Sequence, residues 1–148
     1  MYKHILLPTD GSKLAAKAVK QGIQLAKSIG ARVTIINVVP EYQMVMAEGF
    51  VPPDTAMIRK RFEEAIAKRS KKILDEVKTA AKSAGVKCAG VTLSSGLPYE
   101  AIINQAKKAK CDLIMMASHG RKGIASILLG SETAKVLTHS TIPVLVVR

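Results

Sequence analysis

Five short apolar runs, separated by segments of helical character, constrain the fold of this chain more than any other feature. The runs cover residues 2–7, 33–39, 86–93, 113–117 and 142–147. The segments between them, 12–29, 55–84, 99–108 and 131–139, are predicted helices, and in the first three apolar residues recur at three- and four-residue spacing. This alternation predicts an α/β fold in one domain, 1–148, with a doubly wound parallel sheet and helices on both faces.

The strand-like runs are nearly continuous in apolarity, which indicates that both faces of the sheet are covered. The run 33–39, for example, reads Val-Thr-Ile-Ile-Asn-Val-Val. Ligands of such sheets bind beyond the carboxyl ends of the strands, where the strand order reverses. We therefore expect a site where the loop after the first strand meets the loop after the fourth, provided that these two strands are neighbours.

Both loops carry residues suited to a phosphorylated ligand. Asp10 after the first strand is suited to hold a ribose hydroxyl or, through water, Mg²⁺ on phosphates; the alternative is a plain helix cap. After the fourth strand, Gly120, Gly130 and Ser131 would present backbone N–H groups and a hydroxyl to phosphate oxygens. His119 would add charge there, the alternative being a solvated turn.

Other catalytic patterns fail on spacing. The Walker A loop, the dinucleotide Gly-x-Gly-x-x-Gly and the nucleophile elbow are not matched in these loops. The three histidines form no metal-ligand pattern, and no residue is a convincing base for activating water. We therefore expect no catalytic residue. Residues 40–57 break the pattern, and a connection this long is typical of a lid, a binding loop or a mobile segment.

Charge and composition limit the partners. The formal net charge is +12, and much of it lies in segment 59–72. One interpretation is a solvated helix face with Lys60–Glu64 and Glu64–Lys68 pairs at i,i+4 spacing; the other is a surface for nucleic acid or a partner. The chain has no Trp, two Phe and three Tyr, which argues against stacking on single-stranded nucleic acid. No nucleic acid is therefore expected as the main partner.

The sequence also bears on the compartment. No apolar run approaches the length of a membrane span, and the first residues do not form a signal peptide. Cys88 and Cys111 form neither a CxxC pair nor a zinc spacing. We expect a reduced, cytoplasmic setting.

The chain resembles the universal stress proteins over essentially all of its length. The resemblance is carried by segments 5–12, 118–121, 128–131 and 143–147. The ATP-binding branch of this family carries Gly-x2-Gly-x9-Gly-Ser/Thr. Here Gly120, Gly130 and Ser131 match this motif, and Ala117 stands in place of its first glycine.

This resemblance implies a sheet of order 3-2-1-4-5 and a Rossmann-like site for ATP or AMP, with Mg²⁺ as an additional component. It implies a regulatory stress-response protein with at most slow ATP hydrolysis. Pro8, Thr9 and Asp10 would line the ribose and adenine, and the main chain of Val38 would meet the adenine edge. The other residues implied to bind the nucleotide or its phosphates are Met116, Ala117, Ser118, His119, Gly120, Arg121, Gly130, Ser131 and Glu132.

Two further expectations follow from the resemblance. Members of the family are dimers through the last strand, and an apolar edge strand at 142–147 would favour the same homodimer here. The methyl of Ala117 is expected to crowd the ligand and, if the site needs a positive φ, to cost about 1 kcal/mol. Binding would then be weakened rather than abolished. The alternative is a dimeric stress-response interaction module that binds no nucleotide.

Overall fold

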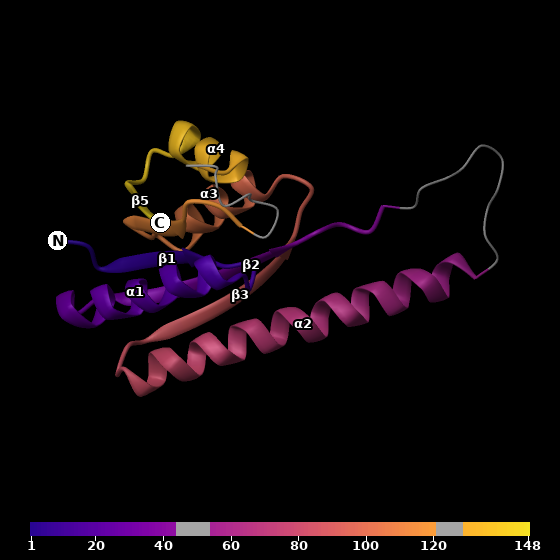
Figure 1. Cartoon of the computed structure of the whole chain (residues 1–148), viewed down its shortest axis with the longest axis horizontal. Coiled ribbons are helices and arrows are strands. Elements are labelled where there is room, and N and C mark those ends of the chain that lie inside the picture. Colours follow the sequence, from indigo (N-terminus) through magenta and orange to yellow (C-terminus); the bar gives the residue numbers. More distant parts are fainter. Residues whose placement is uncertain (44–53, 121–128) are drawn as a thin grey trace.

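A computed structural model describes residues 1–43, 54–120 and 129–148 as a five-stranded sheet flanked by helices (Figure 1). All strand pairs are parallel, and the order is β3-β2-β1-β4-β5. Both the fold class and the strand order predicted above are confirmed. The elements are β1 (His4–Pro8), α1 (Lys13–Ile29), β2 (Arg32–Val39), α2 (Thr55–Ser83), β3 (Cys88–Ser94), α3 (Pro98–Lys108), β4 (Leu113–Ala117), α4 (Ser131–His139) and β5 (Val144–Val147).

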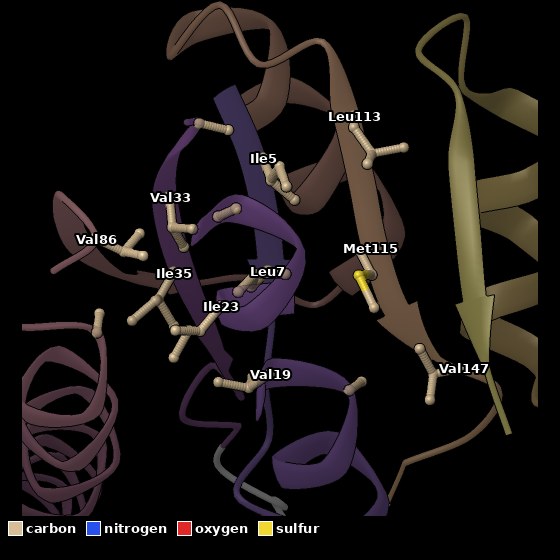
Figure 2. Packing of buried hydrophobic residues seen from close by; sticks show 14 of the residues in the cluster. Ile5, Leu7, Val19, Ile23, Val33, Ile35, Val86, Leu113, Met115 and Val147 are labelled. Carbon is tan, nitrogen blue, oxygen red and sulfur yellow. The ribbon is translucent and has the colours of Figure 1, made fainter. Parts of the chain in front are cut away.

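Helices cover both faces of the sheet, with α1 and α2 on one side and α3 and α4 on the other (Figure 1). Because successive strand residues point to opposite faces, Leu113 and Met115 join a core cluster on the α1 side, together with Val19 and Ile23 of α1 (Figure 2). Met116 joins a second cluster on the α3 side. The central strands are therefore buried on both faces, as their continuous apolarity predicts.

Helix α1 follows β1 after a tight turn that ends in a side-chain cap. The hydroxyl of Ser12 accepts a hydrogen bond from the N–H of Ala15 at 3.2 Å. Gly30 ends the helix with a φ of 68°, a conformation that glycine adopts without steric cost. Ser12, and not Asp10, is thus the N-cap of α1.

Three strands, β1 at His4, β3 at Cys88 and β5 at Val144, begin later than the sequence pattern predicts. The N–H of Val86 bonds to the carbonyl of Ala81 at 2.9 Å, so this residue closes α2 and the strand begins at Cys88. Pro143 has no N–H to offer to a ladder, and β5 begins at Val144.

Helix α2 extends well beyond the sheet at its N-terminal half (Figure 1). Its 29 residues correspond to roughly 44 Å at 1.5 Å per residue. The buried residues, Ser70, Leu74 and Ala81, all lie in its second half. The predicted projection of the basic segment is therefore confirmed. Among the described helices, none is long and apolar enough to cross a membrane.

Candidate functional site

The loops after β1 and β4 meet at the carboxyl edge of the sheet. β1 and β4 are hydrogen-bonded neighbours, with Ile5 opposite Leu113 and Leu6 opposite Ile114. A Cβ built on Gly120 would stand only 2.5 Å from Oδ2 of Asp10. The backbone of one loop therefore lies directly against the carboxylate of the other. The structure thus brings together the two loops that were expected to form the site.

The first loop is held in shape by its own side chains. The N–H of Ser12 donates to Oδ1 of Asp10 at 2.9 Å, and the N–H of Gly11 donates to Oγ1 of Thr9 at 3.2 Å. Pro8 and Thr9 are buried, whereas Asp10 is half-buried. The carboxylate of Asp10 is thus oriented by the turn, as a ligand-facing group needs to be.

A buried amide, Asn37, fixes this loop from below, and the sequence analysis did not single it out. Its Nδ2 donates to the carbonyl oxygen of Thr9 at 2.7 Å, and the N–H of Thr9 donates to the carbonyl of Ile36 at 2.9 Å. Asn37 is 4% exposed. The available signal was a single amide in a largely apolar strand, since a buried polar group needs a hydrogen-bond partner.

The second loop is fastened to the start of α4. The N–H of Gly130 donates to the carbonyl of Ser118 at 2.7 Å, and Oγ1 of Thr133 donates to the carbonyl of Ala117 at 3.0 Å. A Cβ on Gly130 would lie 3.1 Å from Cα of His119. Glycine is therefore favoured at this position by close approach to the backbone of His119, not by an unusual φ, which is −72°.

The N-terminus of α4 points its first amides at this edge. Gly130 is the N-cap, and no side chain of the described residues caps the helix. The first N–H groups of a helix have no partner within it and carry partial positive charge. The amides of Ser131 and Glu132 are thus suited to an anion.

The side chain of Glu132 turns away to another helix. Its Oε2 accepts a hydrogen bond from the N–H of Tyr99 at 2.9 Å, in the first turn of α3, and its Oε1 lies 3.1 Å from Nζ of Lys135. The ammonium of Lys135 also lies over the ring of Tyr99. Glu132 therefore holds α3 and α4 together, which the sequence did not reveal.

Ala117 does not have the strained backbone that was considered for it. It is the last residue of β4 and pairs with Val147. Among the described non-glycine residues, only Asp54 and Lys110 have a positive φ. The Ala117 side chain is 7% exposed and belongs to the core cluster on the α1 side, together with Val147. The expectation of a strain cost is therefore wrong, because a strand conformation suits alanine.

The remaining predicted residues that the structure describes occupy the same edge. Met116 is buried and Val38 half-buried, both on the α3 side of the sheet. Oγ of Ser118 lies 3.2 Å from Nδ1 of His119. Arg121 lies outside the described residues, as does most of the expected lid at 40–57.

Neither of two surface depressions coincides with this edge. One, of about 610 Å³, lies on the outer side of α2 between Lys68 and Thr79. The other, of about 280 Å³, lies at the opposite edge of the sheet, beside Gly30 and Gly85. Gly30 and Gly85 end helices with a positive φ and therefore have a structural role. The residues of the loops after β1 and β4 identify the candidate site better than the two depressions do.

Comparison with known proteins agrees with this geometry. The model of the universal stress protein family matches residues 1–148. Universal stress protein MJ0531 of Methanocaldococcus jannaschii is 37% identical over 150 residues, which span 100% of this chain and 83% of that protein. The solved structure of hypothetical protein MJ0577 superposes with a TM-score of 0.83 at 29% identity, covering 99% of this chain and 96% of that one. A universal stress protein solved in complex with cAMP has a TM-score of 0.72 at 27% identity, with 99% and 97% coverage.

Proposed function

This chain belongs to the universal stress protein family, and from that premise we propose that it binds an adenine nucleotide, ATP or AMP, at the carboxyl edge of its sheet. The observation that carries the proposal is the contact of Asp10 with Gly120, where a methyl group would stand 2.5 Å from the carboxylate. A side chain at position 120 would force the carboxylate or the second loop to shift, beside the N-terminus of α4. The related protein solved with cAMP supports an adenine nucleotide as the ligand.

The base and ribose would lie over the loop after β1. The carboxylate of Asp10, oriented by the N–H of Ser12, would accept hydrogen bonds from ribose hydroxyls. Pro8 and Thr9 would line this side, and the main chain of Val38 would meet the adenine edge. Met116 and Ala117 would flank the nucleotide from the end of β4, Ala117 through its backbone because its methyl is in the core.

The phosphates would lie against the second loop and α4. The backbone N–H groups of His119 and Gly120 and the first amides of α4, at Ser131 and Glu132, would donate to phosphate oxygens. Ser118 would lie beside them, with its own N–H bonded to the carbonyl of Val147. Gly130 would allow the close approach. Arg121, outside the described residues, is proposed to add charge. Glu132 would act through its N–H alone, since its carboxylate is bound to α3.

Magnesium would enter with the nucleotide. The described residues gather no group of three or more His, Cys, Asp or Glu able to hold a metal alone. Phosphate oxygens would therefore supply most ligands of Mg²⁺, with Asp10 contributing through water; the ion would neutralise phosphate charge. We expect at most slow ATP hydrolysis, because the Asp10 carboxylate and the His119 ring are both engaged by neighbours.

The cellular role proposed is that of a cytoplasmic stress-response regulator that acts as a homodimer. β5 is an edge strand, and Leu145 is 44% exposed on it. An exposed apolar edge favours pairing with a second copy, which a two-fold axis would make symmetric. Light scattering at micromolar concentration is expected to give the mass of two chains; a monomer would contradict the dimer and leave the nucleotide site unaffected.

Thermal unfolding with added ligand tests the nucleotide site. At 100 times its Kd, a ligand stabilises the native state by about 2.7 kcal/mol, which corresponds to a rise in Tm of roughly 5–10 °C for a chain of this size. We expect that rise with millimolar Mg-ATP and a smaller one with Mg-CTP. No shift with any adenine nucleotide, in protein shown to be free of bound nucleotide, would instead favour an interaction module.

A further inference from the structure

Three cations, Arg61, Lys68 and Lys72, form a stripe on the side of α2 that faces away from the sheet. Their spacing of seven and four residues places them within roughly 20° of a common line along the helix. The buried residues of α2, such as Ser70 and Leu74, lie on the opposite side. All three cations are exposed. We call these three residues the basic stripe.

The acids of α2 form no ion pair with the basic stripe, and the nearest beyond it, Asp75 and Glu76, line the same surface depression as Lys68 and Lys72. Ion pairs join Arg59 to Glu63 at 2.7 Å, Lys60 to Glu64 at 3.9 Å, and Lys71 to Asp75. The first two of these acids are the only ones in segment 59–72. No ion pair links the basic stripe to any acid of the described residues, so the pair expected between Glu64 and Lys68 does not form.

The basic stripe is also unfavourable for the helix itself. Lys68 and Lys72 are like charges at i,i+4, an arrangement that destabilises a helix by about 0.2–0.5 kcal/mol. Neither side chain packs against the sheet, because the inward positions of this part of α2 are Ser70 and Leu74. The fold therefore gains little from these charges, because the favourable i,i+4 spacings of Glu64 with Lys68 and of Lys72 with Glu76 form no ion pair. A negatively charged partner would compensate for their repulsion.

The shape of α2 makes the basic stripe accessible. Residues 55–69 include no buried residue and project beyond the sheet (Figure 1). The basic stripe spans eleven residues, or roughly 16 Å along the helix. With the net charge of +12, a projecting cationic helix concentrates positive potential where a large anion meets no steric obstacle.

From these observations we propose that the basic stripe binds the phosphate backbone of duplex nucleic acid without regard to sequence. Duplex phosphates form a regular line of negative charge, and cations bind them through release of counterions. Binding of single strands relies on exposed aromatic rings, whereas the ring of Phe62 on α2 packs against Tyr42. A membrane-bound helix needs large apolar side chains among its cations. Met57 and Ile58, the large apolar residues of α2 that are exposed, precede Arg61, and no exposed large apolar residue lies between Arg61 and Lys72.

This surface is separate from the nucleotide site. The basic stripe lies on the outer side of α2, which covers β2 and β3, whereas Asp10 and Gly120 lie at the carboxyl edge between β1 and β4. The proposal therefore does not depend on adenine-nucleotide binding, and either one can fail without the other.

A matched pair of triple variants tests the proposal. The first carries Arg61→Gln, Lys68→Gln and Lys72→Gln. The control carries Lys20→Gln, Lys107→Gln and Lys108→Gln, which remove the same charge from exposed positions on α1 and α3. Both variants should keep the Tm of the parent, since none of these side chains is buried. Binding is measured by fluorescence anisotropy with two 20-base-pair DNA duplexes of unrelated sequence, between 25 and 200 mM salt.

The parent chain is expected to bind both duplexes equally, with log K falling linearly against log salt concentration. Loss of three phosphate contacts should lower that slope by about 2 to 3 and the affinity at low salt at least tenfold, whereas the control should stay within about threefold of the parent. Equal losses in both variants would overturn the proposal. So would absence of duplex binding at 25 mM salt, including the case in which anionic lipid vesicles bind instead.

Discussion

Gly120→Ala is the substitution that probes the proposed nucleotide site most sharply. The added methyl carbon would stand 2.5 Å from Oδ2 of Asp10, whereas ordinary contacts begin near 3.4 Å. One of the two groups must therefore withdraw by about 0.9 Å. Asp10 has little room to yield, because its other oxygen holds the N–H of Ser12 at 2.9 Å.

The size of the effect follows from that hydrogen bond. A hydrogen bond to a charged group contributes about 1.5–3 kcal/mol, and the displaced carboxylate would lose its bond to Ser12 or its position under the ribose. The expected loss of ATP affinity is about 10- to 100-fold. The free energy of unfolding should fall by less than the free energy of ATP binding, because the half-buried carboxylate can be hydrated when no ligand is present.

Isothermal titration with ATP compares the variant with a matched control. Gly96→Ala makes the same chemical change where, among the described residues, the new methyl would meet only Oε2 of Glu41, at 3.7 Å. The control should bind ATP like the parent. If Gly120→Ala also binds like the parent, the contact with Asp10 does not shape the site and the reasoning is refuted. If both variants bind ATP more weakly by the same factor, the effect is not specific to the carboxyl edge of the sheet.

Three further predictions follow. Ala117→Gly should change ATP affinity by less than about threefold in titration and lower the free energy of unfolding by about 1 kcal/mol, because the methyl packs in the core; a large gain in affinity would show that the methyl crowds the ligand. Asn37→Ala should lower that free energy by about 1–3 kcal/mol in urea titrations, since the carbonyl of Thr9 loses a buried donor; an unchanged value would refute this. Burial, followed by the nearby charge of Arg32, lowers the pKa of His4 in the folded chain. The unfolded ring therefore takes up a proton first, so stability should be full above about pH 6.5 and fall as the pH drops through that value to the lower folded pKa; His4→Gln should flatten the fall, and an identical pH profile would contradict it.

Much of the fold could be predicted because its signals are local. The apolar run at 33–39 and the glycine that ends α1 each have one physical interpretation, and both are confirmed. The errors lie at strand starts. The N–H of Val86 bonds to the carbonyl of Ala81 at the end of α2 instead of to a neighbouring strand. The pattern of apolar residues does not distinguish these two partners.

The candidate site was predictable only in part, because several of its contacts join distant residues. The meeting of Asp10 with Gly120 followed from the strand order. The bond of Asn37 to Thr9 spans 28 residues and that of Glu132 to Tyr99 spans 33, and sequence spacing shows neither.

Ala117 was misjudged for a different reason. Residues 113–117 were predicted as a strand, and β4 ends at Ala117 as predicted, but the comparison with a motif glycine led to the expectation of a methyl that faces the ligand. Had the strand period of two been extended from Leu113 and Met115 to Ala117, its side chain would have been assigned to the core.

The central claim is that the carboxyl edge binds an adenine nucleotide. It is tested most directly by identifying the nucleotide that is released when the purified protein is denatured. The full chain is purified without added nucleotide, denatured, and its released small molecules are identified and quantified by mass spectrometry, beside the Gly120→Ala variant. The account predicts ATP or AMP from the parent chain and at least tenfold less from the variant. An empty parent chain that also fails to bind ATP and AMP at millimolar concentration would contradict it.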